Sequence, residues 1–175
     1  MPFEEVGREK IFKGRVFDIE RLQVRLPDGR LTHYELLTHP GAIAIIPLDE
    51  QGRILFVRQF RPAAWQEVLE IPAGTLEKGE DPSTCALREL REETGMGAKQ
   101  IRELGSFFLA PGYSSEKLHL FLGKDLYNAP LKADDDEFLN VEAIPVAQAY
   151  EMARTGGFKD AKTLAGLFLA EPFLQ

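Results

Sequence analysis

The chain has 175 residues, a formal net charge of −7 and 44% hydrophobic residues. This length suits one domain, or a domain with a small appendage, and the apolar content is ample for a core. The negative charge disfavours non-specific binding to nucleic acid or to anionic membranes.

The first residues, MPFEEVGREK, are acidic and contain no apolar signal region. The longest apolar stretch, residues 42–46, is far too short to span a bilayer. The only cysteine, Cys85, excludes an internal disulfide and suits a reducing compartment. We therefore expect a soluble, cytoplasmic protein whose cysteine is a packed rather than a reactive thiol.

Residues 16–26 alternate between polar and apolar and predict a half-exposed strand, and residues 31–37 predict a second one. The Pro-Asp-Gly sequence at 27–29 between them indicates a turn. Such an antiparallel hairpin is marginal alone and has to pack on something else. His-Pro-Gly at 39–41 then separates an N-terminal β subdomain, residues 1–39, from a main domain, residues 40–175.

The main domain contains strands on both sides of one acidic segment. Before it, the sequence predicts a fully buried strand and two more, at residues 42–48, 53–60 and 68–71. After it, we expect strands at 101–109, 117–122 and 138–144, a loop at 126–136 and helices at 146–155 and 161–170. This order predicts an α/β/α sandwich with a mixed sheet.

The acidic segment, residues 74–96, matches the pattern G-x5-E-x7-R-E-U-x-E-E-x-G-U, where U is apolar, without a mismatch. Seven positions demand one residue type: Gly74, Glu80, Arg88, Glu89, Glu92, Glu93 and Gly95. At average residue usage, a chance match has a probability of about 10⁻⁸ per window. The spacing of these residues is therefore strong evidence for a specific sequence motif.

The second half of this segment reads as a helix. Asp81 and Pro82 form a typical helix start, and Gly95 a typical stop. Apolar spacing predicts that the core-facing residues are Ala86, Leu87, Leu90 and Thr94.

Glu89 and Glu93 lie four residues apart and share one stripe of this helix, where like charges repel. A hard divalent cation removes that conflict, since Mg²⁺ and Mn²⁺ prefer carboxylate oxygens. Arg88 can hold Glu92 or another carboxylate beside the metal ligands. The alternative is a solvated acidic face with Arg–Glu pairs, but the complete spacing favours a metal site.

The segment is the Nudix box, and the chain resembles a Nudix hydrolase. Outside the box, Pro111 within Ala-Pro-Gly and the N-terminal hairpin resemble the ADP-ribose diphosphatase branch. Further stretches similar to this branch lie at residues 57–62, 69–74, 134–138 and 160–163. GDP-mannose hydrolases share several of these stretches.

The resemblance implies a metal site and a diphosphate contact. Metal ligands would be Glu89, Glu93, the backbone carbonyl of Ala73 and Glu92, with Mg²⁺ or Mn²⁺ as the cation. Arg88 would belong to the catalytic group and Glu70 to the surroundings of the metal site. Arg61 would bind the diphosphate; the alternative is an ordinary surface cation.

The resemblance also implies a divided substrate site. Tyr34 and Glu35 would bind adenine by stacking and by hydrogen bonding. Glu116 would hold the terminal ribose, and Pro111 would line the site. In this branch the hairpin serves the neighbouring subunit, which implies a C2 homodimer. The alternative for Tyr34 is a half-buried aromatic of an ordinary strand.

A general base is implied in the loop at residues 134–137. Here the chain departs from its relatives, because the position that often carries glutamate holds the shorter Asp135. The base is therefore Asp135, Glu137 or Glu93, and the sequence leaves the choice open. The alternative for the loop is an exposed, solvated turn.

The sequence as a whole predicts Mg²⁺-dependent hydrolysis of ADP-ribose to AMP and ribose 5-phosphate. The nearest alternative is a diphosphatase for GDP-mannose or for a broad set of nucleotide sugars. A non-catalytic ADP-ribose sensor is the alternative of another class. Such sensors carry a C-terminal winged helix, whereas only about one predicted helix follows Lys159 here.

Overall fold

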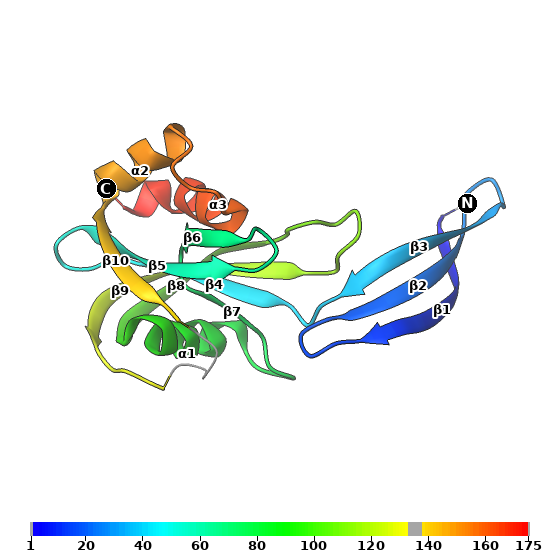
Figure 1. The fold of residues 1–175 in the computed structure, drawn as a ribbon, viewed down its shortest axis with the longest axis horizontal. Coiled ribbons are helices and arrows are strands. Elements are labelled where there is room, and N and C mark those ends of the chain that lie inside the picture. The colour runs from blue at the N-terminus through cyan, green and yellow to red at the C-terminus, as the bar shows by residue number, and fades with distance from the viewer. Residues whose placement is uncertain (1, 133–137, 175) are drawn as a thin grey trace. The chain divides into compact units, whose positions relative to one another are not determined.

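The structure is a computed structural model that describes residues 2–132 and 138–174. The chain divides into two compact units. Unit 1 consists of Met1–Gly41 and Phe107–Leu118, and unit 2 consists of Ala42–Ser106 and His119–Gln175. Figure 1 labels the elements of both.

Unit 1 is built on an antiparallel sheet in the order β1-β2-β3. Its strands are β1 (Glu4–Lys13), β2 (Asp18–Arg25) and β3 (Leu31–Thr38). Strands β2 and β3 form the expected hairpin, with Leu22 opposite Tyr34. Strand β1 pairs with β2 and extends this hairpin to a three-stranded sheet. All of its charged residues are exposed and its register shifts twice, so β1 lacks the regular alternation that marks a strand.

The segment at 107–118 joins unit 1 through the end of β3. The Leu37 amide donates to the Tyr113 carbonyl at 2.8 Å, and the Ser115 amide donates to the Leu37 carbonyl at 2.9 Å. Leu37 and Ser114 thereby form a parallel bridge. The loop is tied to the N-terminal sheet by backbone hydrogen bonds, which side-chain patterns do not predict.

Unit 2 contains the central sheets. One has the order β7-β4-β9-β8 and another has the order β10-β5-β6. The strands are β4 (Ala42–Pro47), β5 (Arg53–Arg61), β6 (Gln66–Glu70), β7 (Ala73–Thr75), β8 (Met96–Phe108), β9 (Lys117–Asn128) and β10 (Asn140–Pro145). The last two residues of β8 and the first two of β9 belong to unit 1. Strand β9 continues to Asn128, so the loop predicted from residue 126 begins later. Lys124, Asp125 and Asn128 interrupt the apolar pattern here, so the sequence did not indicate the end of this strand.

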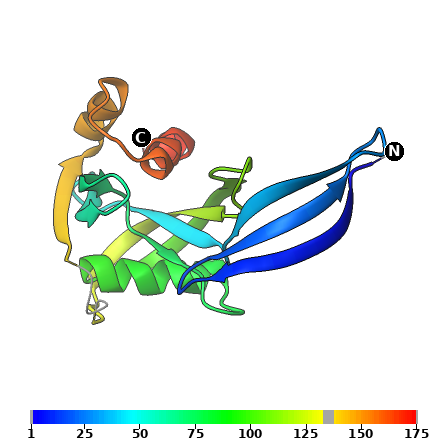
Figure 2. The same cartoon turned by 45° about the vertical axis from the view of Figure 1, so that its right-hand side comes forward.

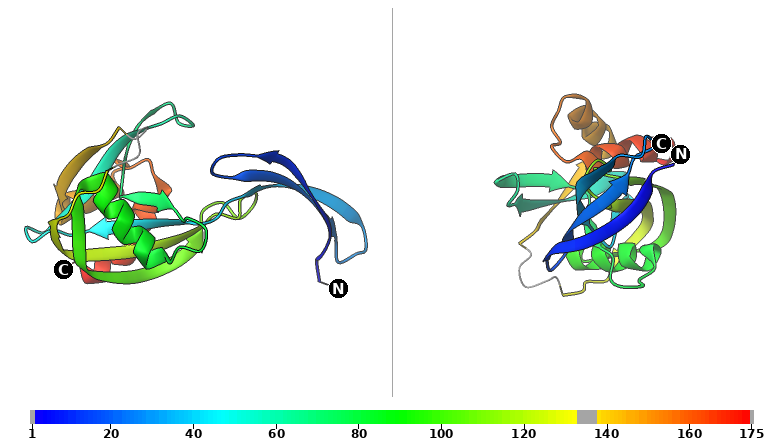
Figure 3. Two further views of the ribbon diagram at one scale, coloured as in Figure 1. Left: turned by 90° about the horizontal axis from the view of Figure 1, so that it is seen from below. Right: turned by 90° about the vertical axis from the view of Figure 1, so that its right-hand side faces the viewer.

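Helices cover both faces of the β4 sheet. The helices are α1 (Pro82–Thr94), α2 (Val146–Arg154) and α3 (Ala161–Ala170), followed by the short η1 (Glu171–Phe173). Helix α1 packs on one face of β4 and α3 on the opposite face (Figures 1 and 2). Seen from below, α1 lies across the sheet (Figure 3). The predicted α/β/α sandwich is confirmed.

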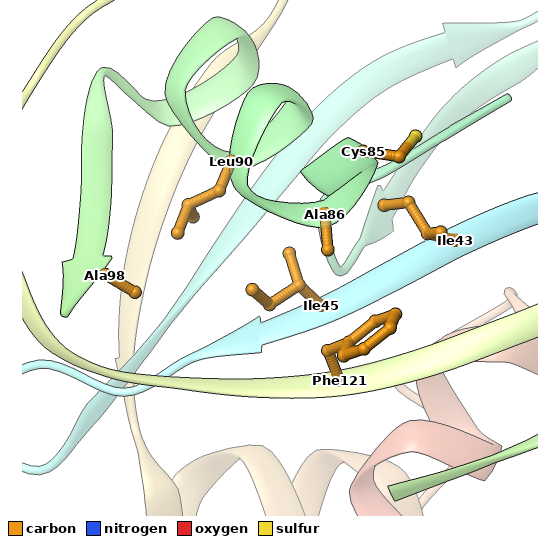
Figure 4. Packing of buried hydrophobic residues seen from close by; sticks show 7 residues of the cluster. All are labelled: Ile43, Ile45, Cys85, Ala86, Leu90, Ala98 and Phe121. Carbon is orange, nitrogen blue, oxygen red and sulfur yellow. The ribbon is translucent and has the colours of Figure 1, made fainter. Parts of the chain in front are cut away.

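Strand β4 is buried along its whole length, as its continuous apolar sequence predicted. Ile43 and Ile45 pack with Ala86 and Leu90 of α1 (Figure 4). This cluster also contains Cys85, Ala98 and Phe121. The packing fixes α1 against β4 and its neighbour β7, and thereby holds the acidic face of the helix in place.

Candidate functional site

Local sequence signals set the ends of α1. The Asp81 side chain accepts hydrogen bonds from the Ser83 and Thr84 amides, at 2.9 and 3.1 Å. At the other end Gly95 adopts the left-handed conformation, with φ of 73°, and its amide donates to the Arg91 carbonyl. Asp81 and Gly95 therefore cap the helix as the sequence predicted.

Glu89 and Glu93 are almost completely buried, with exposed fractions of 7% and 5%. They come from adjacent turns of α1, on the stripe beside its apolar face. The Ala73 amide of β7 donates to Glu93 Oε2 at 3.0 Å. Burying two carboxylates costs free energy unless cations or donors compensate them, which marks this face as a site for positive charge.

Gly74 makes room for one of these carboxylates. A Cβ atom at position 74 would lie 1.9 Å from both Cδ and Oε1 of Glu89. Only a residue without a side chain fits there. The first glycine of the box is thus required by the position of the Glu89 carboxylate, fifteen residues further along the sequence.

Arg88 joins the other acidic residues of the box. Its Nε and Nη2 atoms donate to the two oxygens of Glu80, each at 3.0 Å. Its Nη1 donates to Glu89 at 2.7 Å and to Glu92 at 2.9 Å. The expected contact between Arg88 and Glu92 is therefore present, together with contacts to two further box carboxylates. Such a planar, branched donor holds several carboxylates in fixed positions.

The arginine has a strong electrostatic effect on Glu80. The hydrogen bond from Arg88, together with the Glu77 amide, lowers the pKa of the Glu80 carboxyl to about 2. The same carboxylate raises the pKa of Arg88 above its usual value. Burial, and then Glu80, raise the pKa of the Cys85 thiol to about 12. This supports the interpretation of Cys85 as a packed, unreactive thiol.

The donors of this face suit a hard divalent cation. Among the described residues, no group of three or more His, Cys, Asp or Glu side chains is arranged to hold a metal ion. Mg²⁺, however, commonly binds one or two carboxylates and completes its shell with waters and substrate phosphates. The buried Glu89 and Glu93 carboxylates, beside the Ala73 backbone, meet that smaller requirement.

A second charged group lies in the same unit. Arg61 at the end of β5 donates to both oxygens of Glu70 in β6, from Nε at 2.8 Å and from Nη2 at 2.6 Å. Glu70 also forms an ion pair with Lys162 of α3. The roles of Glu80 and Lys162 were missed by sequence reasoning. Glu80 was visible as a fixed position of the box. Glu70 follows Val68 and Leu69 at the buried end of β6, and a glutamate in such a place indicates a need for buried cations.

The other residues predicted to bind the substrate are not part of these two charged groups. Tyr34 and Glu35 are on β3 of unit 1, where Glu35 forms an exposed ion pair with Arg21. Pro111 and Glu116 are in the 107–118 segment of unit 1. The predicted bases Asp135 and Glu137 lie outside the described residues. In the described part of the chain, no helix is long and apolar enough to cross a membrane.

An acidic helix between a glycine-containing strand and a left-handed glycine cap, packed on a sandwich, is the arrangement that the box predicted. The NUDIX domain family matches residues 37–167. The chain belongs to the Nudix family and is a hydrolase of that family.

Individual relatives are similar over almost the whole chain. An ADP-ribose pyrophosphatase of Bacillus subtilis is 39% identical, over 90% of this chain and 86% of the relative. A methanol dehydrogenase activator of Bacillus methanolicus is also 39% identical, over 99% of this chain and 94% of the relative. A crystal structure of an ADP compounds hydrolase matches with a TM-score of 0.88 at 26% identity, over 99% and 95% of the two chains.

Proposed function

We propose that this protein hydrolyses the diphosphate bond of ADP-ribose to AMP and ribose 5-phosphate, with Mg²⁺ as the cofactor. The observation that carries the proposal is the pair of buried carboxylates, Glu89 and Glu93, held on α1 beside Gly74 and Arg88. The adenine-containing substrate is supported by the similarity to an ADP-ribose pyrophosphatase and to an ADP compounds hydrolase.

In this proposal Glu89, Glu93, Glu92 and the Ala73 carbonyl would hold the cation, and Mn²⁺ would substitute for Mg²⁺. When bound, the cation neutralises diphosphate oxygens and lowers the pKa of a bound water. Arg88 orients the carboxylates through its contacts with Glu89 and Glu92. Gly74 keeps the Glu89 carboxylate close to β7.

Arg61 is proposed to bind the diphosphate. Its side chain is 42% exposed and is therefore accessible from solvent. The contact with Glu70 uses Nε and Nη2, which leaves Nη1 outside that contact. A guanidinium fixed on one edge presents its other edge to phosphate oxygens with little loss of side-chain entropy.

A carboxylate of Asp135, Glu137 or Glu93 is proposed to accept the proton of the attacking water. The Asp135→Ala and Glu137→Ala variants distinguish the first two, and kcat is measured from pH 5 to pH 9. Loss of the base lowers kcat by about 100-fold or more and removes the acidic limb of the pH profile. If both variants retain the wild-type profile, Glu93 is the base.

We also propose a C2 homodimer in which Tyr34 and Glu35 of one subunit read the adenine at the partner's site, while Glu116 and Pro111 complete the substrate contacts. The sheet of unit 1 supports this. Exposed large apolar side chains on it include Ile11, Phe12 and Leu31. A small sheet with so much exposed apolar surface is marginal unless another surface covers it.

Subunit mixing tests this arrangement. Tyr34→Ala and Glu93→Gln variants are each expected to hydrolyse ADP-ribose poorly. In a mixed dimer, one site would combine an intact Glu93 with an intact Tyr34 from the partner, so activity should rise above the mean of the separate variants. A monomer by light scattering, or no gain after refolding the mixture, would contradict the shared site.

The substrate proposal is tested by steady-state hydrolysis of ADP-ribose, ADP-glucose and GDP-mannose with Mg²⁺. We expect the highest kcat/KM for ADP-ribose, with AMP and ribose 5-phosphate as products. A preference for GDP-mannose would identify the alternative diphosphatase, and binding of ADP-ribose without turnover would identify a sensor. The net charge of −7 and the reduced Cys85 favour a cytoplasmic enzyme that does not bind nucleic acid.

A further inference from the structure

Unit 2 contains a charge network in which positive and negative side chains alternate: Arg61, Glu70, Lys162 and Asp160. Arg61 holds Glu70 with two hydrogen bonds, Glu70 contacts Lys162 Nζ, and that Nζ lies 3.1 Å from an Asp160 oxygen. Lys162 and Glu70 are 92 residues apart in the sequence. The charge network links the end of β5, through β6, to the beginning of α3.

The side chains of this charge network differ in their exposure to solvent. The Glu70 side chain is 3% exposed and that of Lys162 is 10% exposed, whereas the Arg61 side chain is 42% exposed. Arg61 is thus the most exposed member of the group, whereas Glu70 and Lys162 are buried. A lysine is rarely buried to this extent unless its charge is paired.

The beginning of α3 compensates Asp160 separately. The Asp160 carboxylate caps the helix, accepting from the Thr163 amide at 2.9 Å and from the Thr163 hydroxyl at 2.6 Å. A carboxylate at a helix N-terminus is further stabilised by the helix dipole. Because Asp160 has these other partners, the charge of Lys162 remains available to Glu70.

Glu70 therefore has two cations. Burial raises the pKa of its carboxyl, but the hydrogen bonds and charges of Arg61 and Lys162 outweigh burial and lower the pKa below its usual value. Without Lys162, Arg61 alone would have to compensate the whole buried charge of Glu70. Its guanidinium would then interact more strongly with the Glu70 carboxylate and bind a second anion less well.

We propose that Lys162 is a positioning residue for Arg61: it supplies the second positive charge to Glu70, so that the guanidinium stays fixed on Glu70 while its outer edge binds an anionic substrate. The inference rests on the proposed function, in which that anion is the diphosphate of ADP-ribose. Lys162 acts only through Glu70 and Arg61.

The first test does not depend on activity. The Arg61 Nε–H signal is followed by NMR in the full-length protein and assigned by its loss in Arg61→Lys. We expect Lys162→Met to shift this signal or speed its exchange, and Lys162→Arg to restore it. The matched control is Lys159→Met, an exposed lysine three residues earlier, which should leave the signal unchanged. An Arg61 signal that is identical in Lys162→Met would overturn the proposal.

The second test is kinetic, with ADP-ribose and Mg²⁺. Lys162→Met should lower kcat/KM by about 10- to 100-fold, the range usual for residues that orient a functional group. Lys162→Arg should recover most of the loss, and Lys159→Met should match the wild type. Wild-type protein without ADP-ribose hydrolysis would refute the proposed function, while the NMR result would still decide the role of Lys162.

A neutral background separates positioning from a general structural role. In Arg61→Met/Glu70→Gln, the added Lys162→Met substitution removes no partner of a buried carboxylate at position 70. We expect it to change kcat/KM by less than about twofold there, since residues that act as one unit are not additive. A further tenfold loss in this background, with wild-type thermal stability, would show that Lys162 acts independently of Arg61 and would overturn the proposal.

Discussion

Gly74 and Glu89 occupy adjoining space so closely that a Cβ atom on the glycine would lie 1.9 Å from the Glu89 carboxyl carbon. The box glycine is therefore not needed for an unusual backbone angle but for the volume that the carboxylate fills. This contact connects the strand that begins the box to the helix that ends it. It explains in physical terms why these two residue types occur together.

Gly74→Ala is expected to displace the Glu89 carboxylate and lower activity. Because the core around β7 and α1 is closely packed, the added methyl group should also destabilise the fold by about 1–3 kcal/mol. The control is Gly7→Ala in β1, where the added Cβ atom would be 3.6 Å from its nearest neighbour, an ordinary contact. Urea unfolding and ADP-ribose hydrolysis measure the two effects. A fully active, equally stable Gly74→Ala protein would contradict this packing.

The pair formed by Glu80 and Arg88 predicts a pH-dependent stability. The Arg88 hydrogen bond lowers the pKa of Glu80 to about 2 from its ordinary 4.5. A carboxyl with a lowered pKa stabilises the fold above its unfolded-state pKa and loses this contribution as the pH falls through the folded value. Glu80→Gln should therefore cost on the order of 2–3 kcal/mol at pH 7.

The difference in unfolding free energy between wild type and Glu80→Gln should shrink between about pH 4.5 and pH 2. Urea titrations at pH 7, 5, 4 and 3 measure it, with Glu50→Gln as an exposed control. A difference that stays constant down to pH 3 would show that ionic pairing with Arg88 is not its source.

Cys85 is expected to resist thiol reagents in the folded protein. Its pKa of about 12 leaves almost no thiolate at neutral pH, and its side chain is fully buried in the α1 cluster. A disulfide reagent such as DTNB at pH 8 should react with one thiol per chain in guanidinium chloride and with almost none in its absence. Rapid modification of the folded protein would mean that α1 separates readily from β4.

Elements with strong local signals were predictable from the sequence. Helix α1 was defined by Asp81 and Gly95, whose capping preferences do not depend on distant contacts. The buried β4 was evident because both of its faces are covered, which leaves a continuous apolar run. Strand β1 lacked such a signal, because its charged residues are exposed and its two register shifts interrupt the alternation of polar and apolar residues.

The site was predictable only in part for a similar reason. Glu89 and Glu93 share a helical stripe, so their proximity follows from spacing alone. The contact between Glu70 and Lys162 depends on how α3 docks against β6, and no local pattern encodes it. The same holds for Gly74, whose contact with Glu89 forms only once β7 lies beside α1.

Glu89 and Glu93 are proposed to hold the catalytic metal ion, and Glu93→Gln removes one of these two charges. Glutamine keeps the size of the side chain and can still accept the hydrogen bond from the Ala73 amide, so the fold should be retained. Its neutral oxygen is a weaker ligand for Mg²⁺. Glu50→Gln again serves as the control for loss of one surface carboxylate.

The measurement is ADP-ribose hydrolysis as a function of Mg²⁺ concentration for wild type and Glu93→Gln, with Mg²⁺ binding followed by calorimetry. We expect Glu93→Gln to lose at least about 100-fold in kcat/KM and to bind Mg²⁺ more weakly, with unchanged circular dichroism. Wild-type turnover and wild-type Mg²⁺ affinity in Glu93→Gln would contradict the metal assignment.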